Sequence, residues 1–125
     1  MKKTFTMMSL MSLLMVNAHA ANWIVFDADQ HIGTNYYDKE TLEYQGSDRK
    51  VTVLNNGGEN EKGAKSTVST AMIDCRLGTF QVLGWQTFSE PMGVGSKLES
   101  SSKPTKVFFI MPGSLEFELK KKICS

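Results

Sequence analysis

Two neighbouring stretches, residues 66–74 and 79–88, constrain the fold of this chain more than any other feature. Both are rich in Thr, Val, Ile and aromatic residues, a composition typical of β-strands. The four residues between them, Cys75-Arg76-Leu77-Gly78, have the length and the glycine of a hairpin turn. Apolar side chains fall on both faces of this hairpin, so we expect it to lie centrally in a sheet, with one face under a helix.

Strict alternation along the two strands assigns their side chains to faces. It places Ala71, Ile73 and Cys75 together in the first strand. In the second it predicts that Leu83 and Trp85 share one face, and that the other face carries Phe80, Val82 and Phe88.

Four further stretches have the composition of strands, namely 23–27, 35–37, 50–54 and 107–111. Residues 38–42 fit either one turn of helix or a loop capped by Asp38. The glycine-rich stretch 55–63 and the serine-rich stretch 96–105 lack a strand pattern, so we expect both to be exposed connections.

The C-terminal residues have the pattern of an amphipathic helix. Pro112-Gly113-Ser114 ends the preceding strand, and Ser114 is a suitable N-cap. Leu115, Leu119 and Ile123 recur at four-residue spacing and form one apolar stripe. The lysine run 120–122 compensates the helix dipole, which explains it more simply than a basic binding patch does. The chain is therefore predicted to be α+β, an antiparallel sheet of about five or six strands with a C-terminal helix packed on one face.

The first twenty residues have the layout of a secretory signal peptide. A short basic start is followed by an apolar stretch and by small residues that end at Ala20. We expect cleavage between Ala20 and Ala21, or one residue later, which leaves residues 21–125 as one domain. No cysteine lies near the cleavage point, so neither a lipid anchor nor a membrane span is expected.

The two cysteines, Cys75 and Cys124, both lie after the leader. In an oxidising compartment an even number of cysteines indicates a disulfide. A bridge between them would close a loop of about 49 residues and tether the end of the helix to the central hairpin turn. Their spacing is far from Cys-x-x-Cys, so a redox-active pair is not expected.

Charge and motifs argue against several classes of function. The leader removes Lys2 and Lys3, which leaves 12 basic residues against 13 acidic ones, so nucleic-acid binding is not expected. His31 is the only histidine left after cleavage, and the acidic residues Asp27, Asp29 and Asp38 lack the EF-hand pattern. No catalytic constellation is recognisable, so we expect a protein that is not an enzyme and holds neither metal nor cofactor.

Aromatic residues crowd the N-terminal third, where the strands are short. Trp23 is interpreted as a core residue, whereas Tyr36 and Tyr37 are adjacent in a strand and must point to opposite faces. Short strands here predict an unpaired sheet edge, which favours either a homodimer or the addition of a strand from a ligand. The outward-facing tyrosine would then lie near the contact, while Lys50 and residues 55–63 would blunt the same edge.

Several segments, taken in order, resemble the bacterial surface-adhesin protein E family. They are Asn35-Tyr36-Tyr37-Asp38-Lys39-Glu40-Thr41-Leu42, Ile73-Asp74-Cys75, Phe88-Ser89-Glu90-Pro91-Met92-Gly93-Val94-Gly95, and Met111-Pro112-Gly113-Ser114 leading to Ile123-Cys124. The resemblance implies a Gram-negative envelope protein with a disulfide-tethered helix, from a family whose adhesins bind host matrix and serum proteins and can dimerise. Two departures are the missing lipid-attachment cysteine and the absence of a basic cluster.

Two functions fit these observations. The first is a non-catalytic, adhesin-like binding protein of the Gram-negative envelope, with a host matrix or serum protein as its partner. The second is a periplasmic inhibitor or envelope accessory protein that acts on another enzyme or assembly. We expect a periplasmic location, with the outer-membrane surface or secretion as the alternatives.

Overall fold

The structure is a computed structural model that describes residues 21–29, 33–57 and 63–125. The strands are β1 (Trp23–Asp29), β2 (Gly33–Asp38), β3 (Glu43–Gln45), β4 (Asp48–Asn56), β5 (Ser66–Asp74), β6 (Thr79–Phe88), β7 (Lys97–Ser101) and β8 (Phe108–Phe109). Two 3₁₀ turns, η2 (Lys39–Thr41) and η3 (Pro91–Gly93), and one helix, α1 (Leu115–Ile123), complete the described elements.

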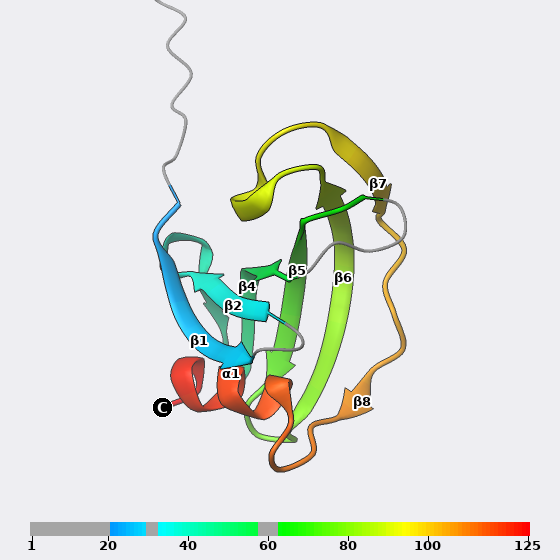
Figure 1. Cartoon of the computed structure of the whole chain (residues 1–125). Coiled ribbons are helices and arrows are strands. Elements are labelled where there is room, and N and C mark those ends of the chain that lie inside the picture. Colours follow the sequence, from blue (N-terminus) through cyan, green and yellow to red (C-terminus); the bar gives the residue numbers. More distant parts are fainter. Residues whose placement is uncertain (1–20, 30–32, 58–62) are drawn as a thin grey trace, which may run out of the picture.

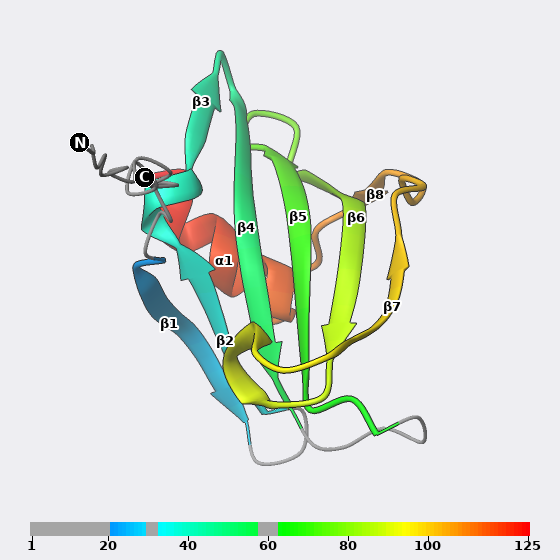
Figure 2. The same cartoon turned by 90° about the horizontal axis from the view of Figure 1, so that it is seen from above.

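The strands form one antiparallel sheet in the order β1-β2-β4-β5-β6-β7 (Figures 1 and 2). The short strands β3 and β8 pair with the outer sides of β4 and β6. The hairpin β5–β6 has the predicted bounds and lies inside the sheet, because β4 flanks one side and β7 and β8 flank the other. The α+β prediction is confirmed.

Helix α1 lies across one face of the sheet, at the end that carries the β5–β6 turn (Figure 1). It begins at the predicted cap, where Ser114 Oγ accepts a hydrogen bond from Phe117 N at 3.2 Å. Leu119 and Ile123 are buried, and they pack in a core with Val51, Ala71 and Ile73 from the centre of the sheet. Leu115 packs against this core from the first turn, so the apolar stripe is confirmed.

The predicted disulfide joins the end of α1 to the central hairpin turn. Cys75 and Cys124 are bonded, with an S–S distance of 2.03 Å. A second contact holds the same end of the helix, because Arg49 Nε on β4 donates to the carbonyl of Ile123 at 3.2 Å. The last turn of the helix is therefore fixed both covalently and through a backbone carbonyl that the helix itself leaves unpaired.

A β-bulge corrects the predicted faces of β6. Ala71 pairs with Val82, but Ser69 pairs with Trp85, so β6 contains one more residue than β5 across this interval. The extra residue reverses the alternation beyond it. Val82 and Trp85 therefore share the helix-covered face, and the predicted grouping of Trp85 with Leu83 is wrong.

Three strand expectations also need correction. The serine-rich stretch 96–105 contains β7, which is polar because an edge strand needs no apolar face. The apolar stretch 107–111 has only two paired residues, β8, and is largely exposed. Finally, β3 was not predicted, and its pairing with β4 places Lys50 inside the sheet rather than at an edge.

Asp38 has the predicted role of a cap. Its side chain is buried, and Oδ1 accepts hydrogen bonds from Glu40 N at 3.0 Å and from Asn22 N at 2.9 Å. The backbone of Asn22 in turn accepts from Lys39 N at 3.0 Å. These bonds fix the start of the described chain against the η2 turn.

Candidate partner-binding surfaces

The two tyrosines point to opposite faces, as predicted, but neither lies on an edge strand. Tyr37 is 8% exposed and belongs to the core. Tyr36 is half-buried on the other face, where its ring meets that of Trp23 at 6.5 Å in an edge-on arrangement. Trp23 is thus only partly buried. Because β2 lies between β1 and β4, the expected position of these tyrosines at a free edge is wrong.

Both ends of the strand order carry features that discourage pairing with another strand. In β1 the register shifts between Val25 and Asp27, a bulge that bends the edge strand. At the other end, β7 begins with an exposed lysine, Lys97, and the next residue, Leu98, is the extra residue of a register shift against β6. Bulges and lysines are common means by which sheet edges avoid adding a further strand.

A larger candidate surface lies at the end of the molecule that carries the β5–β6 turn. Five large apolar side chains are exposed there, and we call them the end surface: Leu77, Val107, Phe108, Phe109 and Met111. Phe109 is the most exposed of them at 72%. Adjacent exposed apolar side chains of this kind commonly mark protein-interaction sites.

Backbone contacts hold the end surface in place. Phe108 and Phe109 pair with Phe80 and Thr79, and the Phe108 ring packs edge-on against that of Phe80 at 5.3 Å. Ile110 N donates to the carbonyl of Gly78 at 2.8 Å, which joins the segment to the hairpin turn. The sequence signal for this surface was the apolar stretch 107–111, whose composition fits a buried strand equally well.

The charges beside the end surface are mixed. Arg76 and Lys106 are exposed next to its apolar residues. Within the turn, Asp74 Oδ1 accepts from Leu77 N and from Arg76 N, both at 2.9 Å. The hydrogen bond from Leu77 N is the main reason why the pKa of the Asp74 carboxyl lies below its ordinary value of 3.8. The carboxylate therefore stabilises the turn on which Leu77 is displayed.

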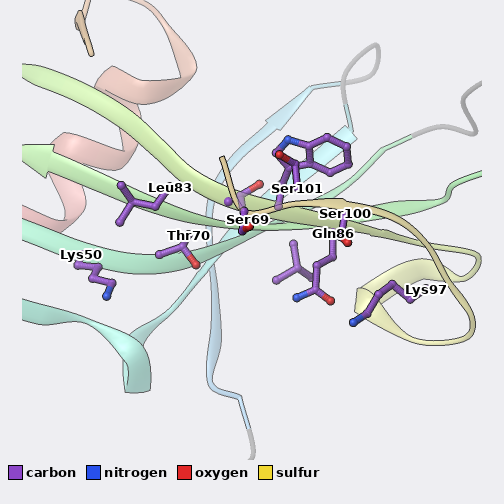
Figure 3. A pocket seen from close by; sticks show the side chains of 12 residues that line it. Lys50, Ser69, Thr70, Leu83, Gln86, Lys97, Ser100 and Ser101 are labelled. Atoms are coloured by element: carbon purple, nitrogen blue, oxygen red, sulfur yellow. The ribbon is translucent and has the colours of Figure 1, made fainter. Parts of the chain in front are cut away.

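A groove with both polar and apolar lining occupies the sheet face opposite the helix. It has a volume of about 550 Å³ and lies over β4, β5, β6 and β7. Figure 3 shows Lys50 and Lys97 toward its two ends, with Thr70, Leu83 and Gln86 between them. Leu83 is the extra residue of the β6 bulge, and with Val68 it contributes apolar surface to the lining of the groove.

A smaller cleft lies on the other face, at the first turn of α1, and we call it the helix-end cleft. Its volume is about 180 Å³, and its lining includes Phe26, Asn35, Val82, Leu115 and Glu116. Asn35 is 3% exposed, and its Oδ1 accepts from Asn55 Nδ2 at 2.9 Å. Its Nδ2 is buried without a partner among the described residues, which costs about 1–3 kcal/mol for such a donor.

Among the described residues, no three His, Cys, Asp or Glu side chains gather in the manner of a metal site. His31, the leader including Ala20, and the side chain of Asp29 lie outside what the structure describes, whereas Ala21 is exposed at its start. The described helix is too short to cross a bilayer.

The sequence profile of the family "Surface-adhesin protein E" matches residues 23–125. Solved structures of Haemophilus influenzae protein E share the fold at low sequence identity. One crystal form gives a TM-score of 0.63 at 15% identity and covers 83% of this chain and 96% of that chain. Protein E from a non-typeable strain gives a TM-score of 0.62 at 13% identity, and the match covers 94% of this chain and 82% of that chain. A search of curated proteins finds no match.

Proposed function

Because the chain belongs to the surface-adhesin protein E family, we propose that it is an exported, non-catalytic protein of the Gram-negative envelope that binds host matrix or serum proteins. The family supports an adhesin-like surface protein, and it favours binding over catalysis. The partner and its contact surface are the parts that we add.

The observation that carries the proposed contact is the end surface. Aromatic and large aliphatic side chains supply most of the binding energy in protein interfaces when they become buried. The end surface offers two phenylalanines and three aliphatic or thioether side chains on a segment held by backbone hydrogen bonds. An anchored segment loses little conformational freedom on binding, so more of the contact energy contributes to affinity.

The test compares two variants with matched exposure. Phe109→Ser removes the most exposed side chain of the end surface, whereas Val94→Ser removes one that is 58% exposed on the loop after η3, at the opposite end of the molecule (Figure 1). Binding of the purified protein to reconstituted basement-membrane matrix and to serum-coated surfaces would be measured by biolayer interferometry.

We expect Phe109→Ser to weaken binding about tenfold or more, and Val94→Ser to change it less than about twofold. Both side chains are exposed, so neither substitution removes core packing. Equal effects of the two substitutions would contradict the end surface as the contact. An absence of any binding by the unaltered protein would contradict the host partner.

Location separates this function from the alternative of a periplasmic inhibitor or accessory protein. We expect protease added to intact cells to degrade a protein that is displayed to the host. Protection until the outer membrane is opened would instead favour a partner inside the envelope.

A homodimer through the β1 edge stays a prediction, to be tested by sedimentation across a concentration range. Val25 is exposed on this strand, so Val25→Lys should weaken such a dimer. Dimers that persist in this variant would indicate another interface.

A further inference from the structure

The helix-end cleft exists because α1 covers only one end of the sheet face on which it lies (Figure 1). Because α1 (nine residues) lies across the strands (Figure 1), it covers each strand over about its own diameter of 10–12 Å, whereas the nine residues of β5 span about 30 Å. The helix therefore covers only part of this face, and the cleft of about 180 Å³ lies at its first turn. Cavities of roughly 150 Å³ lined by apolar side chains are large enough to bind benzene.

The lining is apolar except at a few positions. Phe26, Phe80 and Leu119 are buried in it, and Val82 and Leu115 complete the apolar wall. Polar groups come from Asn35, Asn55, Ser69 and Glu116. Such a combination, an apolar lining with few polar groups, is typical of small-molecule sites.

Asn35 supplies an unused hydrogen-bond donor in the lining of the cleft. Because its Oδ1 accepts the hydrogen bond from Asn55 Nδ2, the orientation of the amide is set, with Nδ2 as the unused donor. A donor buried in this way would be satisfied by an acceptor atom that enters the cleft. The Glu116 carboxylate in the lining disfavours an anionic ligand.

We propose that the helix-end cleft binds a small uncharged molecule with a single ring, whose carbonyl oxygen accepts a hydrogen bond from Asn35 Nδ2. This activity is separate from the proposed binding of host proteins, which uses exposed side chains of the end surface.

Three probes of about nine non-hydrogen atoms each separate the contributions to binding. Acetophenone has the ring and the carbonyl, cumene has the ring with an isopropyl group instead, and benzoate adds a negative charge. Titration of ¹⁵N-labelled protein, followed by NMR, should give a dissociation constant of millimolar order for acetophenone. We expect cumene to bind at least about fivefold more weakly, because it leaves the Asn35 donor unsatisfied, and benzoate to bind more weakly than acetophenone.

The side-chain NH₂ signals of Asn35 provide a direct readout. They should move with acetophenone and remain in place with cumene. In Asn35→Leu, the affinity for acetophenone should fall to that for cumene. In Glu116→Gln, benzoate should bind more tightly while acetophenone is unaffected, and the near-isosteric change at this half-buried helix position leaves the packing of the helix intact.

A matched pair of substitutions tests the location. Ser69 borders both hollows, but its side chain lies on the same face of β5 as Ala71 and Ile73, which the helix covers, so Ser69→Phe should fill the cleft and abolish binding. Thr70, the next residue on β5, faces the groove on the other side, so Thr70→Phe should leave binding unchanged. No saturable binding of acetophenone, equal affinity for cumene, or equal loss in both phenylalanine variants would overturn the proposal.

Discussion

Removing the disulfide between Cys75 and Cys124 should destabilise this protein strongly. The Cys75→Ala/Cys124→Ala double variant opens a loop of 49 residues. By the loop-closure estimate, that adds about 4 kcal/mol of conformational entropy to the unfolded state at 25 °C. Domains of this size commonly have about 5–15 kcal/mol of total stability, so the loss is a large part of it.

The structure indicates where this loss should be seen first. Apart from the disulfide, the end of α1 is held by burial of Ile123 and by the bond from Arg49 Nε to its carbonyl. Without the disulfide, the last turn should open locally before the sheet unfolds. Amide exchange should therefore accelerate at Lys122 and Ile123 while the β5–β6 amides remain protected.

The measurement is guanidinium denaturation of protein purified from periplasmic extract, followed by fluorescence of the tryptophans. We expect the double variant to lose about 3–5 kcal/mol, and the wild-type protein treated with reductant to lose the same amount. A loss below about 1 kcal/mol in both samples would refute the reasoning, because it would mean that packing and Arg49 alone fix the helix.

Three other predictions follow from the described contacts. Asp38→Ala should lower stability by about 0.5–2 kcal/mol in thermal or denaturant unfolding, because it removes the cap of η2 and the carboxylate that accepts from the N–H groups of Glu40 and Asn22; an unchanged midpoint would contradict this. Asp74 has a folded pKa below its ordinary value, so its carboxylate stabilises the fold above about pH 4 and loses that effect as the pH falls through the lowered pKa. The difference in Tm between wild type and Asp74→Asn should therefore shrink from about pH 6 to about pH 2, and a constant difference would count against it. N-terminal sequencing of exported protein should begin at Ala21 or one residue later, which keeps the Asn22 contacts with Asp38 and Lys39 intact; a start at Met1 would refute cleavage.

Much of this protein follows from local sequence signals. The hairpin strands β5 and β6 and the helix α1 have the predicted bounds, because each combines a clear periodicity with its own stop signal. The disulfide was predictable for a different reason, since the chain has two cysteines, which have only one way to pair within it.

Tertiary structure decided the features that depend on which strands pair with each other. A polar stretch became β7 because the free side of β6 supplied its hydrogen bonds, which composition does not encode. The bulge at Leu83 changed the faces of β6, and a single extra residue of this kind leaves no signature in an alternating sequence.

The candidate surfaces, too, combine features that the sequence shows with features that only the tertiary structure decides. The apolar stretch 107–111 was visible in the sequence, but its exposure depends on how few of its residues pair with β6. Tyr36 and Tyr37 were visible too, yet only the strand order shows that β1 covers their strand. Side-chain chemistry is local and can be read from the chain, whereas burial depends on which distant strand or helix lies alongside.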